Sequence, residues 1–274
     1  RSIIADYNSA EEKLCVYHST QGPHMMQAIF AKHFGLEEHN VRIIAGDVGG
    51  AFGIKIHTYG DELATVALSI LLKRPVKFIA DRLESFTADI HARDHIIRGR
   101  MGVDKDGKIT AGEAELYYQA GAFQGSPVQP GAMCAFAPYD LENVKAYGYD
   151  VVVNRPKVAA YRAPGAPISE YAVESVLDEL AKKLGIDPID FRLKNAAKEG
   201  TQAYYGPVLG RIGYIETLEQ ARAHDHMKTK LGPNQGRGIA TAFWNTLGME
   251  TSATINVNTD GTINLITGSV DLGG

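Results

Sequence analysis

Residues 46–55 read Gly-Asp-Val-Gly-Gly-Ala-Phe-Gly-Ile-Lys, and four of the first eight are glycine. Glycines let the backbone come close to a ligand and present N–H groups to it, so this loop favours an anionic partner. Phe52 is an unusual large aromatic residue for such a turn. One alternative is a tight turn that packs Phe52 into the core. Another is a dinucleotide loop, but that loop should lead directly into a helix, and residues 54–58 intervene here.

The chain on both sides of this loop alternates between strand and helix patterns. Strands are expected at residues 14–17 and 41–45, with a helix between them that Pro23 opens and Gly35 ends. Residues 61–73 form an amphipathic helix that Pro75 stops, and a strand follows at 76–79. The buried side of that helix is expected to carry Leu63, Val66, Ala67, Ile70 and Leu71.

The second half of the chain continues this mixture. Residues 95–103 and 108–118 flank a hairpin turn at 104–107, and 147–153 is a further strand. Helices are expected at 169–184 with Gly185 as the cap, from Asp187-Pro188 onward, and more weakly at 215–230. The first of these helices should bury a stripe made of Ala172, Val176, Leu180 and Leu184.

A linker pattern at residues 231–236 suggests a domain boundary, because a β-hairpin signal follows at 254–258 and 262–267. We therefore expect a first domain at residues 1–232 and an incomplete, strand-rich second one at 236–274. The predicted class is α+β, with mixed sheets and helices packed on them. The first residue is arginine, and the last residues follow a strand-like run, so the chain is interpreted as a fragment.

Composition narrows the functional classes. The 274 residues are 45% hydrophobic and carry a net charge of −4, which disfavours a nucleic-acid or polybasic membrane surface. Cys15 and Cys134 form no CxxC pair, which disfavours a zinc or iron–sulfur site built from this chain. No apolar run approaches the roughly 18 residues of a membrane span. Two scattered thiols fit a reducing compartment, so a cytoplasmic location is expected.

Other segments could carry chemistry. Gln21, in the turn before the first helix, can both donate and accept a hydrogen bond, although a surface residue in a capping segment is the alternative. Arg162 lies in a rigid loop at residues 159–167 that could hold it against an anion, or it is a connector residue paired with a carboxylate. His91 and His95 could bind a metal on a helix, but a strand pattern favours solvated or hydrogen-bonded histidines.

In this order and spacing, the motifs resemble the molybdenum hydroxylases of the xanthine dehydrogenase and aldehyde oxidase family. The resemblance rests on Ser-Thr-Gln at 19–21, Gly-Gly-Ala-Phe-Gly at 49–53, Arg-Pro-Val-Lys at 74–77, Tyr-Arg-Ala-Pro-Gly at 161–165 and Asp-Pro-Ile-Asp-Phe-Arg-Leu-Lys-Asn at 187–195. It extends from about residue 10 to the end of the chain.

This resemblance implies an oxidoreductase that binds a molybdopterin cofactor and hydroxylates an aldehyde or N-heterocycle, a small molecule, with oxygen derived from water. Iron–sulfur clusters and FAD are expected on partner subunits or domains, together with a remaining molybdopterin-binding segment. Molybdenum is held through the pterin, with no direct protein ligand. The catalytic glutamate base is expected beyond Gly274, so no catalytic residue is assigned and the fragment alone should be inactive. A non-catalytic scaffold or assembly fragment is the alternative.

By the same resemblance, Gln21 contacts the apical oxo ligand, the loop Gly49, Gly50, Ala51, Phe52 and Gly53 reaches the molybdenum ligands, and Arg162 lies beside the pterin. Gly273 and Gly274 are also expected to contact the cofactor. They stand where many members have Gly-Gln-Gly, so the contact of that glutamine is missing or altered here. Substrate-pocket positions are Ile56, Ala163, Trp244 and Asn245, within a segment at 244–249.

Departures from the family limit the substrate. Ile56 replaces a glutamate of purine-oxidising members, and residues 127–134 lack their arginine. Ala163 replaces the copper-binding cysteine of carbon monoxide dehydrogenases. Purine and carbon monoxide oxidation are therefore both disfavoured.

Overall fold

The computed structural model describes residues 1–92, 94–245 and 252–273. The contacts divide the chain into two compact units that interleave in the sequence. The first unit takes residues 1–90, 160–162 and 246–274, and the second takes 91–159 and 163–245.

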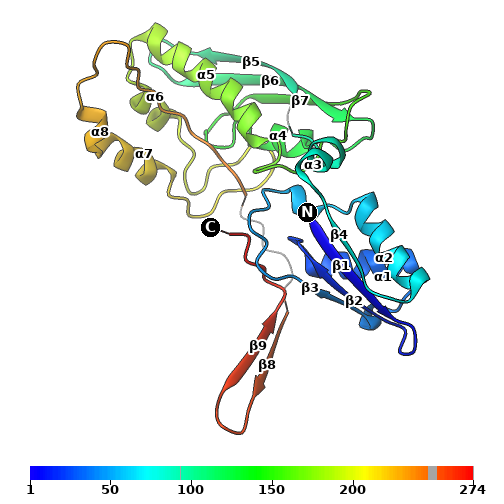
Figure 1. Cartoon of the computed structure of the whole chain (residues 1–274). Helices are drawn as coiled ribbons and strands as arrows, with labels where there is room; N and C mark the ends of the chain where they lie inside the picture. Colours follow the sequence, from blue (N-terminus) through cyan, green and yellow to red (C-terminus); the bar gives the residue numbers. More distant parts are fainter. Residues whose placement is uncertain (93, 246–251, 274) are drawn as a thin grey trace. The chain divides into compact units, whose positions relative to one another are not determined.

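The first unit is built on a mixed sheet in the order β3-β2-β1-β4 (Figure 1). Its strands are β1 (Ser2–Asn8), β2 (Lys13–His18), β3 (Val41–Ile44) and β4 (Val76–Ile79). β2 and β3 are parallel, so the chain must cross over between them, and helix α1 (Pro23–Phe34) makes that connection. Alternate residues of β1 and β2 pack with α1 and α2 (Gly60–Leu72) in one core, which includes Ile3, Ala5, Leu14, Val16, Phe30 and Val66.

The ends of α1 agree with the sequence prediction. Pro23 occupies the first turn, and Gly35 caps the other end in the left-handed region at φ +65°. Short 3-10 turns, η1 (Glu38–Asn40) and η2 (Ile54–Ile56), follow, as does helix α3 (Arg82–Ala88), which Asp81 caps by accepting a hydrogen bond from Glu84 N. The sequence patterns did not predict α3 or β1.

The predicted buried face of α2 is partly wrong. Val66 is buried, but Ala67 is exposed and the side chain of Leu71 is 75% exposed. Polar positions are buried in their place: Glu62, Thr65 and Ser69. Each has a partner; Glu62, for example, lies 3.1 Å from both Arg1 and His18. Buried polar groups are tolerated where they are hydrogen-bonded, and hydropathy spacing does not contain that information.

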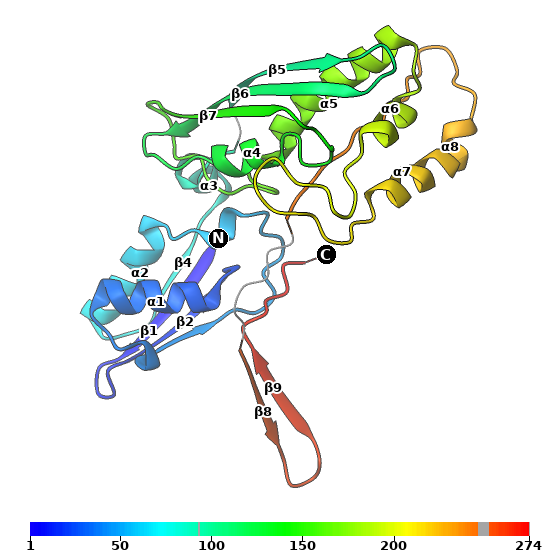
Figure 2. The same ribbon diagram turned by 180° about the vertical axis from the view of Figure 1, so that it is seen from behind.

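The second unit contains a three-stranded sheet in the order β5-β6-β7 (Figure 2). β5 (His95–Val103) and β6 (Ile109–Gly121) form the predicted hairpin, and β7 (Val144–Val152) lies parallel to β6. Helices α4 (Val128–Cys134) and α5 (Ala166–Leu184) pack against the sheet and against each other. Leu116, Tyr118, Phe136, Leu177 and Phe191 belong to the core between these elements. The sequence patterns missed α4.

Two helix predictions in this unit need correction. The predicted stripe on α5 is only half-buried, and the fully buried line runs one residue further along, through Val173, Leu177 and Ala181. The predicted stripe borders the packed face, where Val176 lies against Gly99 of β5. The helix expected at 215–230 is divided into α7 (Tyr214–Ala223) and α8 (Asp225–Lys228), because the backbone of His224 is extended at ψ 139°.

The remaining predictions hold where the structure describes them. Asp187 caps α6 (Pro188–Asn195) by accepting hydrogen bonds from Ile189 N and Asp190 N. β8 (Ala253–Val257) and β9 (Ile263–Thr267) form the predicted C-terminal hairpin. Mixed sheets with packed helices confirm the α+β class, and the division at residues 232–236 stays a prediction. Among the described residues, no helix combines the length and apolar character needed to cross a membrane.

Candidate functional site

The glycine loop adopts a backbone that few residues tolerate. Gly49, Gly50 and Gly53 have φ values of +69°, +91° and +99°, and Phe52 joins them at +54°. Glycine reaches this region without steric cost, whereas a bulky residue is strained there. The Phe52 side chain is 56% exposed, so the alternative that packs it into the core is wrong. The loop therefore holds a strained aromatic residue at the surface of the first unit.

Gln21 is joined to this loop through both its side chain and its backbone. Its side-chain Oε1 accepts a hydrogen bond of 2.9 Å from Gly53 N. Its backbone N donates to Lys55 O at 2.9 Å, and Thr20 Oγ1 donates to the same oxygen at 3.2 Å. Because Oε1 accepts this bond, the amide nitrogen of Gln21 carries N–H groups that can donate to another partner.

Residues 160–162 form the next wall of the site. Arg162 N donates to Phe52 O at 2.8 Å, and the Arg162 guanidinium carbon lies 5.8 Å from the centroid of the Phe52 ring. A Cβ atom on Gly53 would stand only 2.5 Å from Ala160 O. Only glycine permits this approach of the two backbones.

Residues 271–273 lie along the other side of the loop. Val48 N donates to Asp271 O at 3.0 Å, and Gly50 N donates to Leu272 O at 2.7 Å. Asp271 in turn accepts from Gly273 N at 2.7 Å. The predicted cofactor residue Gly273 thus lies at the loop, whereas Gly274 lies outside the described residues. Segments far apart in the sequence meet here within one unit.

Backbone strain is a signal that the sequence reasoning missed. Phe52, Arg162 and Ala163 all have positive φ values, at +54°, +24° and +56°. Non-glycine residues in such conformations cost about 1–3 kcal/mol each and persist where the surroundings hold them, often at ligand sites. Phe52 and Arg162 are hydrogen-bonded to each other, so the strain is concentrated at one point of the site.

The proposed substrate-pocket residues fall in both units. Ile56 is half-buried in η2 of the first unit. Ala163, Trp244 and Asn245 belong to the second unit, where Asn245 Nδ2 lies 3.5 Å from Met133 Sδ and the Trp244 side chain is 41% exposed. Residues 246–249 of the same predicted segment lie outside the described residues. The role of these positions stays a prediction.

His95 and Cys134 have structural explanations. His95 lies on β5, stacks on Tyr118 at 3.9 Å and accepts a hydrogen bond from Gln119 N, so the helical metal pair with His91 is wrong. Burial raises the pKa of the Cys134 thiol to about 12, which makes it unreactive. Across the described parts of the chain, no group of three or more His, Cys, Asp and Glu side chains could hold a metal ion.

A buried acid lies on α5 of the second unit. Burial raises the pKa of Glu170 from 4.5 to about 7, although its carboxylate accepts a hydrogen bond of 2.7 Å from Phe243 N. One helical turn on, Glu174 accepts from Thr241 N at 2.7 Å and pairs with buried Arg192 at 2.8 Å. These carboxylates hold the extended segment that leads to Trp244.

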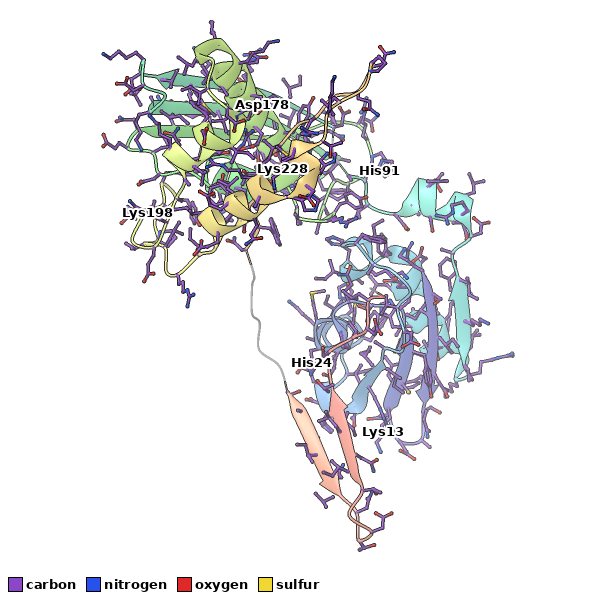
Figure 3. All side chains as sticks on the ribbon, turned by 90° about the vertical axis from the view of Figure 1, so that its left-hand side faces the viewer. Lys13, His24, His91, Asp178, Lys198 and Lys228 are labelled. Carbon is purple, nitrogen blue, oxygen red and sulfur yellow. The ribbon has the colours of Figure 1, made fainter. Side chains whose placement is uncertain are left out.

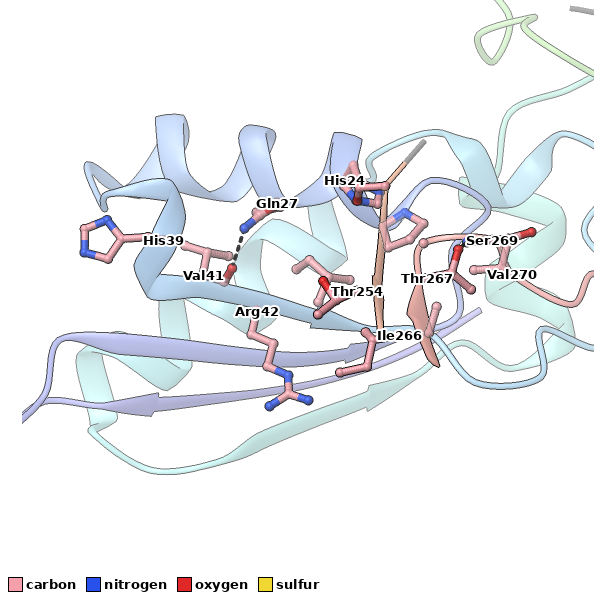
Figure 4. A pocket seen from close by; sticks show the side chains of 15 residues that line it. His24, Gln27, His39, Val41, Arg42, Thr254, Ile266, Thr267, Ser269 and Val270 are labelled. Atoms are coloured by element: carbon pink, nitrogen blue, oxygen red, sulfur yellow. Dashed lines mark hydrogen bonds between the residues drawn. The ribbon is translucent and has the colours of Figure 1, made fainter. Parts of the chain in front are cut away.

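A polar cavity of about 420 Å³ lies in the first unit between α1, β3 and the C-terminal hairpin (Figure 4). His24 lines it at the base of the hairpin (Figures 3 and 4). Its Nε2 lies 3.1 Å from Ser252 Oγ. Ala45 and Val270 also line the cavity. Ala45 directly precedes the glycine loop, and Val270 directly precedes the segment at 271–273. The cavity therefore adjoins the loop along the chain.

Comparison with known proteins decides the family. Residues 1–196 match the family model of the molybdopterin cofactor-binding domain. The chain belongs to this family. As a molybdopterin cofactor-binding domain it is 33% identical over 220 residues to the nicotinate dehydrogenase large molybdopterin subunit of Eubacterium barkeri, covering 79% of this chain and 52% of that subunit. It is 32% identical to the xanthine dehydrogenase molybdenum-binding subunit of Escherichia coli O157:H7, covering 96% of this chain and 37% of the relative.

The solved structures agree on the fold of this molybdopterin-binding chain. The aldehyde oxidoreductase from Desulfovibrio desulfuricans superposes with a TM-score of 0.85 at 24% identity, covering 96% of this chain and 30% of that one. The chain thus spans between 30% and 52% of the lengths of these relatives. The resemblance to the molybdenum hydroxylases predicted from the motifs is confirmed.

Proposed function

We propose that this chain is the molybdopterin-binding part of an oxidoreductase that hydroxylates an aldehyde or N-heterocycle with oxygen derived from water. The convergence of Gln21, the glycine loop and Arg162 on one point of the first unit carries this proposal. The name of one relative points the same way, since nicotinate is an N-heterocycle.

The residues present fit a large anionic cofactor. Among the described residues other than Gly49 and its two chain neighbours, no atom lies within 4 Å of where a Cβ on Gly49 would stand, so the loop backbone is open to a ligand there. Gln21 offers its amide N–H groups, and Arg162 brings a guanidinium to the same loop. Bound molybdopterin would supply the redox chemistry and hold the molybdenum. Its backbone cradle would be formed by Gly49, Gly50, Ala51, Phe52, Gly53 and Gly273.

Side chains near the cofactor would set the substrate class. Ile56 is apolar where purine-oxidising members carry a glutamate, and Ala163 is small where carbon monoxide dehydrogenases carry a cysteine. We infer a neutral or aromatic substrate. The proposed substrate-contacting residues are Ile56 in the first unit and Ala163, Trp244 and Asn245 in the second. Neither purine oxidation nor carbon monoxide oxidation fits this set.

The complete enzyme needs further parts. We infer that iron–sulfur and FAD subunits or domains accept the electrons, and that a glutamate beyond Gly274 is the catalytic base. Residues 236–274 would begin a second molybdopterin-binding domain after a first at 1–232. The expected location is cytoplasmic.

Metal and pterin analysis of the isolated complex tests the proposal. Stoichiometric molybdenum and pterin fluorescence after oxidation are expected. Their joint absence would refute the proposal and favour a non-catalytic scaffold. Turnover of a matched panel of aldehydes, N-heterocycles and purines then separates the substrate classes, and Ile56→Glu is the variant expected to raise purine turnover relative to the rest.

A further inference from the structure

Lys55 contacts both the turn that carries Gln21 and the start of the glycine loop at Val48. It lies in η2, two residues after Gly53. Its carbonyl oxygen accepts hydrogen bonds from Gln21 N at 2.9 Å and from Thr20 Oγ1 at 3.2 Å. Its Nζ reaches back across the loop and donates to Val48 O at 2.7 Å. One residue thus ties the Gln21 turn to the start and the end of the loop.

The bond to Val48 closes the loop over residues 48–55. Val48 N is bonded to Asp271 O on its other side, so Val48 is held from both directions. Gln21 is likewise held at two points, by Gly53 N through its side chain and by Lys55 O through its backbone. If Lys55 releases Val48, the loop loses the connection that fixes its entry relative to Gln21.

The position of the Lys55 ammonium group has an energetic cost. Burial lowers the pKa of Lys55, and its side chain gives up rotamer freedom to reach a neutral carbonyl. A hydrogen bond from a charged donor is stronger than a neutral one, which offsets part of this cost. The arrangement also places a positive charge beside the loop, where it would attract an anionic ligand.

We propose that Lys55 is a positioning residue of the cofactor site: its ammonium holds Val48 and its carbonyl holds Gln21, so that the loop and the Gln21 amide keep one relative geometry. This inference rests on the proposed function, because it presumes that the loop binds molybdopterin. Lys55 acts through Gln21 and the loop backbone.

The test compares Lys55→Met, which keeps an unbranched side chain without the charge, with Lys55→Arg, which restores a cationic donor. Lys13→Met is the matched control, because Lys13 is an exposed lysine of the same unit on β2 that pairs with Glu11 (Figure 3). Molybdenum content, melting temperature and the g-values of the reduced Mo(V) signal are measured on the isolated complex. Hydrogen exchange at the Gln21 and Gly53 amides is measured on the same samples.

Lys55→Met should lower the molybdenum content about tenfold, on the scale of one lost charge-assisted hydrogen bond. The remaining Mo(V) signal should shift, the two amides should exchange faster, and Lys55→Arg should recover most of the metal. Lys13→Met should match the wild type. Unchanged metal, g-values and exchange in Lys55→Met overturn the inference, as does a loss that Lys55→Arg fails to recover. A wild-type complex without molybdenum instead refutes the proposed function, whatever the exchange data show.

Discussion

Gly53→Ala is the most direct test of the site geometry, because the added methyl group would clash with the backbone of residues 160–161. The new Cβ would lie 2.5 Å from Ala160 O, 2.9 Å from Ala160 C and 3.2 Å from Tyr161 Cα. Contacts of Cβ atoms below 3.0 Å are essentially never seen, so the Gly53 and Ala160 backbones must separate by about 0.5 Å. That movement pulls on the hydrogen bonds from Gly53 N to Gln21 and from Arg162 N to Phe52.

The cost has two parts. An L-residue in the left-handed region at φ +99° loses about 1–2 kcal/mol, and overpacking against backbone costs about 1–3 kcal/mol more. The free energy of unfolding should therefore fall by about 2–5 kcal/mol. If the overpacking cost of about 1–3 kcal/mol displaces the loop from its cofactor-binding geometry, the affinity for molybdopterin should fall about 5- to 150-fold.

Urea unfolding and molybdenum content of the isolated subunit measure both effects. Gly35→Ala is the matched control: Gly35 has φ +65° at the end of α1, and beyond its own helix and chain neighbours no described residue comes within 4 Å of its added Cβ. It should cost only the backbone part, about 1–2 kcal/mol, and leave the molybdenum content unchanged. Equal unfolding and equal metal content in the two variants would refute the close approach of residues 53 and 160.

Three further predictions concern the second unit. Glu170→Gln should flatten the pH dependence of stability. The folded pKa of Glu170, about 7, exceeds the ordinary 4.5, so the wild type should lose about 3 kcal/mol of stability as pH rises from 4.5 through 7. Urea unfolding at pH 5 and pH 8 would show whether the variant escapes that loss. Arg192→Met should destabilise the protein by about 3–5 kcal/mol in urea unfolding, because it leaves Glu174 buried without its ion pair. The exposed ion pair between Arg222 and Asp190 should contribute under about 1 kcal/mol in the same assay. Asp187→Ala should cost about 1 kcal/mol in thermal unfolding through the lost cap of α6, and an unchanged melting temperature would contradict that cap.

Local sequence patterns predicted the elements whose ends carry their own chemistry. Pro23 and Gly35 delimit α1, Asp187 caps α6, and Asp104 to Gly107 turn the β5–β6 hairpin. The patterns failed where hydrogen-bond and ion-pair partners from distant parts of the chain, and not hydropathy, determine which side chains are buried. The buried face of α2 holds Glu62 and Ser69, whose partners lie elsewhere in the sequence, and α3 and β1 carried no apolar periodicity strong enough to predict them.

The residues of the candidate site were predicted by type and order, but their contacts were not. Nothing in the sequence joined Gln21 Oε1 to Gly53 N, or placed residues 271–273 along the loop, because these bonds span tens to hundreds of residues. Lys55 ends the glycine-rich stretch 46–55, and its position in the sequence assigns it no role. Its bond to Val48 exists only in the folded loop.

The sequence by itself determined the family, the α+β class and the identity of the loop, since glycine spacing, caps and turn residues act through local backbone sterics. Tertiary structure decided that Phe52 is exposed and strained, that Gly53 must be glycine because Ala160 O lies against it, and that Lys55 spans the loop. Those facts depend on close packing between distant segments, and such distances are fixed only when the chain has folded.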